Sequence, residues 1–291
     1  MFWDAPHHAA FISAVIMACG LCACAPVSAD KDAKAIAAPR IVSLDFCADQ
    51  YVLELLPKSQ ILALSPDART DFSYHKTRAA GVAQVRPRTE DVLALKPDLV
   101  LRSYGGGPQA ERLYKAAGVP VINIGWAQTL SGEDIGSVSA VMRDVAAQLK
   151  VSDKGEALIQ NYHARLTALS AEGQNRSHAL YMTPYGVTTG PGSLVHDMIE
   201  LAGFENFESR AGWRPLPLER LTSERPEFVI TGFFDSHQSQ TANWSSMRHP
   251  IAKAALEGSN AISLKGAWTS CGAWFLLDAV EEMQAAKGTP K

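Results

Sequence analysis

Short apolar runs alternate along this chain with segments whose apolar residues recur at helical spacing. The runs are rich in Val, Ile and Leu and contain few polar residues, which is the pattern of strands buried on both faces. They lie at Ile41–Leu44, Ile61–Leu64, Leu99–Leu101, Val119–Ile124, Ala179–Met182, Phe228–Thr231 and Ala261–Leu264. Strands that alternate with helices form parallel sheets, so we expect the α/β fold class.

One long helix is predicted over Ser152–Ala171. Ser152 and Asp153 are favourable N-terminal capping residues, and Gly173 provides a stop. Its apolar positions recur on one face, at Leu158, Tyr162, Leu166 and Leu169. A helix of this length spans about 30 Å, so it can act as a rigid strut.

A second amphipathic helix is expected directly before the strut, over Ser131–Leu149. Its apolar side carries Ile135, Val138, Met142, Val145 and Leu149. This spacing is that of a helix that buries one face against a core.

A repeated segment divides the chain into two halves. Glu90 is followed by Pro97 and a strand, and Glu219 is followed by Pro226 and a strand at the same spacing. Self-similarity of this kind indicates two related lobes. We therefore expect an N-terminal α/β lobe over 40–150, a linking helix over 151–173, a C-terminal α/β lobe over 174–291, and a ligand cleft between the lobes.

The N-terminal residues are typical of an export signal. An apolar segment runs over Ala9–Ala25 and is followed by small residues, so residues 1–29 are interpreted as a signal peptide and 30–39 as a tether. Two processing sites compete: Leu21–Cys24 resembles a lipobox with Cys24 acylated, whereas Val27–Ala29 fits cleavage before Asp30. An uncleaved anchor is a third interpretation, which the short apolar segment disfavours.

Composition agrees with a globular protein of two lobes. The chain has 291 residues, of which 47% are hydrophobic and 20% charged, enough for a sizeable core. The net charge of −3, with both signs interspersed, gives no electrostatic case for nucleic-acid binding.

Two cysteines remain once the leader is set aside. Cys47 and Cys271 each follow a predicted strand, the first and the last of the chain. An exported protein meets an oxidising compartment, so a disulfide between them is one hypothesis, provided that their Cα atoms approach within about 7 Å. Two free thiols that contact a ligand are the other hypothesis.

Aromatic residues gather where the predicted strands end, which is where open parallel sheets bind ligands. Many aromatics at these positions indicate a wide cleft for a large, partly planar ligand, although some of them can instead be core residues. Two arginines on the loops favour an anionic chelate, or are plain surface charges. The predicted ligand-binding residues are Phe46, Cys47, Arg69, Tyr74, Tyr104, Trp126, Tyr185, Trp213, Arg214, Phe233, Trp268 and Cys271.

Motifs for catalysis are missing from the sequence. It has no GxSxG, HExxH or P-loop motif, and Gly105–Gly107 lacks the spacing of a dinucleotide fingerprint. The histidines do not pair at metal-ligand spacing. We therefore predict no catalytic residue, metal site or cofactor. An exported α/β enzyme without a recognisable motif is the alternative, and a structural or adhesive protein is a third.

These features together resemble a known family. The export signal, the Arg40–Leu44 opening, the Glu90 and Glu219 segments and the linking helix are similar to those of periplasmic binding proteins of iron-siderophore and cobalamin importers. The resemblance covers about Arg40 to Met283. It implies a binding protein that is not an enzyme and that carries a ferric siderophore, haem or corrinoid to an ABC permease dimer with its ATPase.

The resemblance also assigns roles to individual residues. Trp213 precedes Glu219 at the spacing of an aromatic that stacks on the corrin in cobalamin-binding members, whereas Gln84 stands at the equivalent position before Glu90. Glu90 and Glu219 are expected to dock on the permease, and helix capping is their alternative role. The protein is expected to act as a monomer, either free in the periplasm or anchored facing it through Cys24.

Overall fold

The computed structural model describes residues 38–170, 176–235 and 245–287. Residues 38–291 form one compact unit. The predicted signal peptide, Cys24 and most of the predicted tether at 30–39 lie outside the described residues, as do 171–173 of the predicted linking helix.

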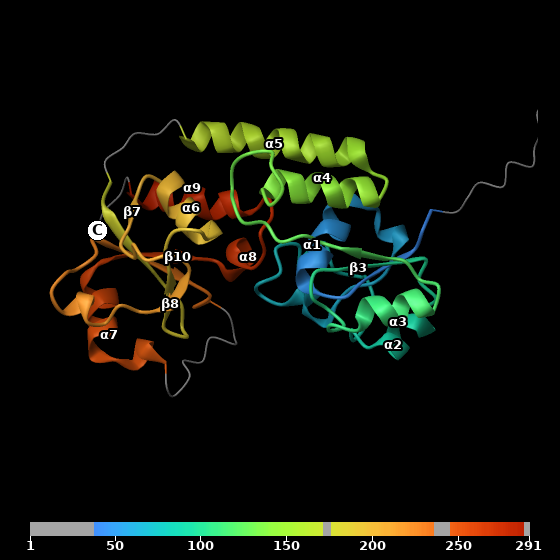
Figure 1. Ribbon diagram of the computed structural model, residues 1–291, viewed down its shortest axis with the longest axis horizontal. Helices are drawn as coiled ribbons and strands as arrows, with labels where there is room; N and C mark the ends of the chain where they lie inside the picture. The colour runs from blue at the N-terminus through green and yellow to red at the C-terminus, as the bar shows by residue number, and fades with distance from the viewer. Residues whose placement is uncertain (1–37, 171–175, 236–244, 288–291) are drawn as a thin grey trace, which may run out of the picture. The chain divides into compact units, whose positions relative to one another are not determined.

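The N-terminal lobe is built on a parallel sheet of four strands in the order β2-β1-β3-β4 (Figure 1). Its strands are β1 (Ile41–Ser43), β2 (Ile61–Ala63), β3 (Leu99–Arg102) and β4 (Val121–Asn123). Its helices are α1 (Phe46–Leu55), α2 (Thr89–Ala94) and α3 (Ala110–Ala116), with the 3-10 turns η1 (Lys58–Gln60) and η2 (Pro66–Arg69). Ile41 and Leu101 face the cluster that contains α1, whereas Val42 and Val100 face α2 and α3, so both faces of the sheet are buried.

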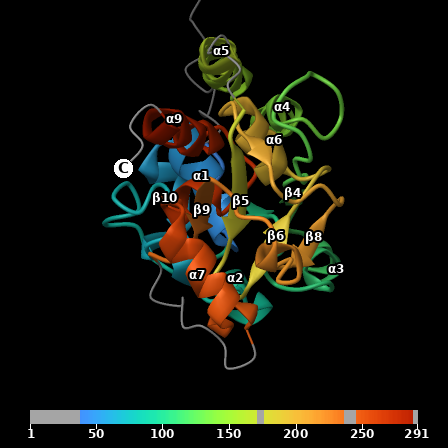
Figure 2. The ribbon, with the colours of Figure 1, turned by 90° about the vertical axis from the view of Figure 1, so that its left-hand side faces the viewer.

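The C-terminal lobe repeats this plan with a parallel sheet in the order β10-β9-β5-β7. Its strands are β5 (His178–Met182), β7 (Glu205–Asn206), β9 (Phe228–Gly232) and β10 (Asn260–Leu264). Its helical segments are α6 (Leu194–Leu201), η3 (Arg220–Thr222), η4 (Ser246–Arg248), α7 (Pro250–Gly258), α8 (Gly266–Thr269) and α9 (Leu276–Lys287). Figure 2 shows α6 and α9 on one side of this sheet and α7 on the other.

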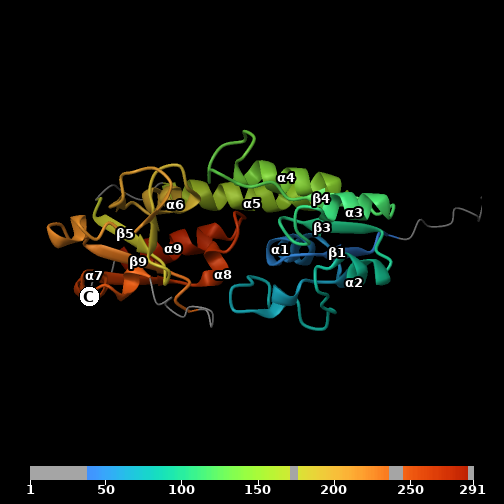
Figure 3. The same cartoon turned by 60° about the horizontal axis from the view of Figure 1, so that its bottom comes forward.

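Two long helices connect the lobes. In the views of Figures 1 and 3, α4 (Val138–Gln148) and α5 (Ser152–Ser170) lie side by side, and α5 continues toward the C-terminal lobe. Tyr162 of α5 is 1% exposed and belongs to the same apolar cluster as residues of both lobes. The predicted two-lobed α/β architecture with a linking helix is confirmed.

The helix expected to start at Ser131 starts later. Gly132 and Gly136 have φ angles of 95° and 94°, which a helix does not contain, and the Ser137 hydroxyl caps α4 by accepting the Ala140 N–H at 3.1 Å. Residues 131–137 therefore form a loop, and Ile135, expected on the apolar face, is fully exposed.

A small antiparallel ribbon was not predicted. β6 (Val187–Thr189) pairs with β8 (Trp213–Pro215), which brings Thr189 opposite Trp213. The segment after Glu219 also differs from expectation, because it forms the 3-10 turn η3 and not an α-helix. The ribbon carries Trp213, one of the predicted ligand-binding residues.

Candidate functional site

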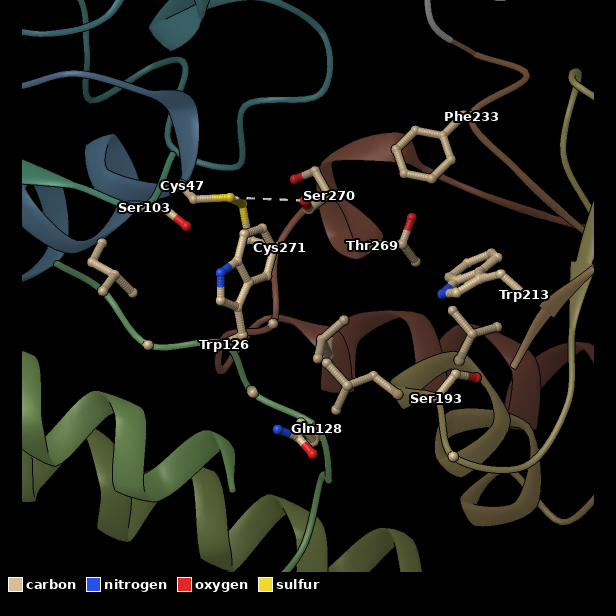
Figure 4. Close-up of a pocket in the computed structure, with 18 of the residues that line it drawn as sticks. Cys47, Ser103, Trp126, Gln128, Ser193, Trp213, Phe233, Thr269, Ser270 and Cys271 are labelled. Atoms are coloured by element: carbon tan, nitrogen blue, oxygen red, sulfur yellow. Dashed lines mark hydrogen bonds between the residues drawn. A yellow bond between two sulfur atoms is a disulfide. The ribbon is translucent and has the colours of Figure 1, made fainter. Parts of the chain in front are cut away.

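A cavity of about 310 Å³ opens between the lobes, where loops from both sheets meet (Figure 4). Its walls come from the N-terminus of α1, the loops after β3 and β4, the start of α6, β8, and the segment that joins α8 to α9. The lining residues are Cys47, Tyr51, Ser103, Ile124–Gln128, Tyr181, Gly192–Val195, Trp213, Phe233, Thr269–Gly272 and Leu276.

Two exposed tryptophans line the cavity. Figure 4 shows Trp126 and Trp213 on opposite sides of the cavity, and their side chains are 68% and 57% exposed. The Trp213 ring meets the buried Tyr181 ring edge to face, with 6.2 Å between centroids. Exposed indole faces that line a cavity suit the stacking of a planar ligand.

The loop that carries Trp126 is fixed at Leu130. The Leu130 N–H donates to the Asp197 carboxylate of α6 at 3.3 Å, and its carbonyl accepts the Tyr162 hydroxyl of α5 at 2.7 Å. Burial raises the pKa of the Asp197 carboxyl, an effect that the Leu130 hydrogen bond opposes. This loop leaves the N-terminal lobe and is held by the C-terminal lobe and α5.

A buried carboxylate, Asp45, holds the loop after β3, which forms part of the cavity wall. Asp45 Oδ2 accepts the backbone N–H groups of Ser103, Tyr104 and Gly105 at 2.7 to 3.0 Å, and Oδ1 caps α1 through Ala48. The loop after β3 is thereby held against the helix that carries Cys47.

A disulfide crosses the cavity wall. Cys47 of α1 and Cys271, between α8 and α9, are bonded, with their Cα atoms 5.7 Å apart. Both residues line the cavity, so the bond joins the two lobes at the site itself.

Phe233 occupies a strained position at the end of β9. Its φ angle is 67°, in the left-handed region that an aromatic residue rarely adopts. Figure 4 shows its ring over the cavity, which it lines together with Thr269. Backbone strain of this kind concentrates at functional sites.

Among the residues that the structure describes, the cavity lining carries no charged side chain. The polar groups present in the described lining are hydroxyls and one amide, from Tyr51, Ser103, Gln128, Tyr181, Ser193, Thr269 and Ser270. Burial raises the pKa of the phenols of Tyr51 and Tyr181 well above their ordinary value, so both stay protonated. The described lining can therefore stack on a planar ligand and form hydrogen bonds with it, and it presents no charged side chain.

Five predicted ligand-binding residues line this cavity, and the others lie elsewhere. Cys47, Trp126, Trp213, Phe233 and Cys271 are brought together. Phe46 and Tyr104 contact each other edge to face at 5.9 Å, outside the lining. Tyr185 is 52% exposed in the turn between β5 and β6.

Three of the four remaining predicted residues make contacts within the protein, and the fourth lines another hollow. Arg69 donates to the Val82 carbonyl, and the Lys265 ammonium lies 4.6 Å from the Trp268 ring centroid. Tyr74 stacks on Phe275 at 4.4 Å. Arg214 lines a second hollow on the C-terminal lobe.

The polar lining residues were missed from the sequence although a signal existed. Ser103 directly follows β3, and Gln128 lies in the loop after β4, which are positions that the strand-end rule singles out. Only aromatic residues were selected at those positions. Ser193 lies at the start of α6 and Thr269 at the end of α8. A rule based on strand ends does not locate residues at helix ends.

The two predicted docking glutamates are both exposed. Glu90 lies in the first turn of α2, and Figure 1 shows α2 on the side of the N-terminal lobe away from α5. Glu219 directly precedes η3 and lines the second hollow.

The lobes, the linking helix and the cavity between the lobes define a two-lobed ligand-binding protein. Residues 41–247 match the periplasmic binding protein family, and the chain belongs to that family. This finding confirms the resemblance drawn from the Glu90 and Glu219 segments. Members of the family are binding proteins of the periplasm.

Several characterised relatives can be compared in detail. The vitamin B12-binding protein of Salmonella typhimurium is 26% identical over 204 residues, which cover 67% of this chain and 72% of that relative. The apo periplasmic heme-binding protein of Roseiflexus sp. RS-1 superposes with a TM-score of 0.67 at 20% identity, over 86% of this chain and 99% of that one. The periplasmic vitamin B12-binding protein of Vibrio cholerae gives 0.59 at 19% identity, over 85% and 96%. The structural similarities show the fold.

No helix among the described residues is long and apolar enough to cross a membrane.

Proposed function

We propose that this protein captures a corrinoid in the cleft between its lobes and delivers it to an ABC permease dimer with its ATPase. The observation that carries the ligand class is that the described lining has no charged side chain and has Trp126 and Trp213 on opposite sides. A corrin is a large, largely planar ring with amide groups at its edge, so indole faces and the Gln128 amide match it. The sequence relatives that bind vitamin B12 support the same ligand class.

Haem and ferric siderophores fit this lining less well. Haem carries two carboxylates, and its iron usually takes a His, Met, Cys or Tyr ligand from the protein. The described lining has no His, Met, Lys or Arg, its two cysteines are bonded to each other, and its two tyrosines are buried. Anionic siderophores would likewise meet no cationic side chain in the described lining.

The ligand is identified by titrating the mature protein separately with cyanocobalamin, haemin, and hydroxamate and catecholate ferric siderophores. We expect cyanocobalamin to quench tryptophan fluorescence with one-to-one stoichiometry. Tight haemin binding with a shifted haem absorption band, and no response to cyanocobalamin, would contradict the corrinoid assignment. Silence with every compound would contradict the transport role.

The same titration separates a binding protein from an exported enzyme. A binding protein returns cyanocobalamin chemically unchanged after release, as chromatography of the recovered ligand would show. Recovery of a converted product under turnover conditions would favour the enzyme alternative.

Export and assembly complete the proposal. The protein acts as a monomer on the periplasmic side of the inner membrane, held through acylated Cys24 or released by cleavage before Asp30. Mass spectrometry of the mature N-terminus distinguishes the two. A diacylglyceryl group on Cys24 supports the anchored form, and a free Asp30 supports the released form.

A further inference from the structure

Phe233 has a backbone conformation that its place in the fold does not explain. Three non-glycine residues among those that the structure describes have positive φ angles, namely Lys96, Lys150 and Phe233. The two lysines directly follow the C-caps of α2 and α4, where a left-handed residue is an ordinary way to end a helix. Phe233 instead follows the buried strand β9, and its φ angle is 67°. Its conformation therefore needs another cause.

The residue before Phe233 has to be a glycine. A Cβ atom on Gly232 would collide with the hydroxyl of Tyr181, whose ring contacts Trp213 edge to face. Tyr181 and Trp213 both line the cavity. β9 thus ends with its backbone against the cavity wall, and the turn that follows starts there.

The turn after β9 is fastened to Gly266, the first residue of α8. Both oxygens of the Asp235 carboxylate accept the Gly266 N–H, at 3.0 and 3.1 Å. A Cβ atom on Gly266 would lie 3.2 Å from Phe233 Cδ1 and 3.6 Å from Cβ of Phe72, a residue of the N-terminal lobe. The Phe233 ring therefore lies close to the Gly266 backbone on one side and faces the cavity on the other (Figure 4).

The conformation of Phe233 lowers the stability of the fold. A left-handed backbone is unfavourable for a residue with a Cβ atom, and glycine would avoid this cost. Strained residues persist where the surrounding structure holds them, and they cluster at ligand sites. Here the strain keeps an aromatic face at the cavity.

We infer that Phe233 is a third aromatic contact for the ligand, and that Asp235 and Gly266 are positioning residues that hold its ring over the cavity. Folding free energy is given up for ligand affinity at this turn. This inference rests on the proposed function, since it takes the cavity to be the site of the corrinoid.

The role of Phe233 is tested on the mature protein by isothermal titration with cyanocobalamin and by thermal unfolding. We expect Phe233→Ala and Phe233→Gly each to raise Kd about tenfold, because both remove the ring. The glycine variant should unfold about 2 °C above the alanine variant, because only glycine relieves the left-handed strain. At an ordinary backbone position the order would be reversed. Phe233→Tyr should keep most of the affinity.

Lys150 provides the matched control for strain. Its φ angle is 59°, and it lies outside the cavity lining. Lys150→Gly should likewise unfold about 2 °C above Lys150→Ala. Neither variant should change Kd.

The positioning role is tested by combining variants. Gly266→Ala should displace the Phe233 ring, and Asp235→Ala should release the turn, so each is expected to raise Kd about threefold. In a Phe233→Ala background neither should raise Kd further, because they act through the ring. Gly258→Ala is the control, since a Cβ atom there meets Arg225 Nη1 at an ordinary 3.8 Å.

Four results would overturn the inference or part of it. Unchanged Kd in Phe233→Ala and Phe233→Gly, with wild-type binding intact, refutes the inference and leaves the proposed function standing. A glycine variant that is less stable than the alanine variant refutes the strain. Effects of Gly266→Ala and Asp235→Ala that persist without the ring refute the positioning role. If the wild-type protein does not bind cyanocobalamin, the proposed function fails and the inference fails with it.

Discussion

The Tyr74 hydroxyl of the N-terminal lobe donates a hydrogen bond of 2.9 Å to Asp278 Oδ2 at the start of α9 in the C-terminal lobe. Asp278 Oδ1 in turn accepts Arg165 Nη2 of α5 at 2.7 Å. Burial and the neighbouring Asp278 carboxylate raise the pKa of Tyr74 to about 12, so the hydroxyl keeps its proton. Together with the Cys47–Cys271 bond, this contact ties the lobes together beside the cleft.

Removal of the disulfide should loosen this connection. We expect the double variant Cys47→Ser, Cys271→Ser to lose about 2 to 5 kcal/mol in the free energy of unfolding, because the bond closes a loop of more than 200 residues. Urea unfolding of the oxidised protein, the variant and the dithiothreitol-reduced protein measures the loss. The reduced protein should match the variant, and equal stability of all three would show that the bond contributes nothing.

Asp49 should make stability depend on pH. Its carboxylate is buried and bonded to the Ser65 N–H and hydroxyl, and burial raises its pKa from 3.8 to about 7. The folded state therefore keeps a proton that the unfolded chain releases. This contribution is full below pH 3.8 and is lost as the pH rises to about 7.

Asp49→Asn removes this titration while keeping the shape of the side chain. Relative to wild type, the variant should gain a few kcal/mol between pH 4 and pH 8, since each pKa unit is worth about 1.4 kcal/mol. Chemical unfolding across this range measures the difference. The exposed Asp134→Asn is the control, and a gain that is the same at every pH would refute the role of Asp49.

Trp213 should contribute strongly to ligand affinity. Trp213→Ala removes an exposed indole face from the cavity, and such anchors typically cost 2 kcal/mol or more, about thirtyfold in Kd. Isothermal titration with cyanocobalamin measures the change, and Trp213→Phe should retain part of the affinity. Trp268→Ala, which removes an indole outside the cavity, is expected to leave Kd within about twofold; a larger effect there than at Trp213 would shift the site.

The two predicted docking glutamates should affect uptake without affecting ligand binding. Glu90→Gln combined with Glu219→Gln is expected to abolish transport of labelled cobalamin into cells and to leave the Kd of the purified protein unchanged. Both residues are exposed and lie outside the cavity lining. Glu111→Gln with Glu257→Gln removes one exposed carboxylate from each lobe as a control, and uptake that persists in the first pair would reduce Glu90 and Glu219 to helix caps.

The architecture could be predicted because its signals are local. Short strands such as Phe228–Gly232 are buried on both faces, which shows as an apolar run, and α5 shows as a stripe at helical spacing. The β6–β8 ribbon could not be predicted, since its strands are three residues long, one ends in Pro215, and they are far apart in the chain. Its stability comes from pairing, which local patterns do not reveal.

The lining of the cavity could be predicted in part for a similar reason. Strand ends located Trp126 and Phe233, because the carboxyl ends of parallel strands share one edge. The rule could not tell which aromatics face the cavity, so Tyr104 and Trp268 were selected too, and they contact Phe46 and Lys265 outside the lining. The direction in which a loop side chain points depends on contacts with other segments. The loop that carries Trp126, for example, is held by the hydrogen bonds of Leu130 to Asp197 and Tyr162.

Because Leu130 is held by residues from later in the chain, neither half of the chain can form the cavity alone. The segment over Gly125–Leu130 is encoded in the first half, yet its hydrogen-bond partners Asp197 and Tyr162 come from later in the chain. A fragment that stopped at residue 150 would carry Trp126 on an untethered loop, and a fragment that began there would lack one wall of the cavity. Each half therefore lacks part of the cavity. Two polypeptides that each contain one complete sheet would regain ligand binding only when they associate.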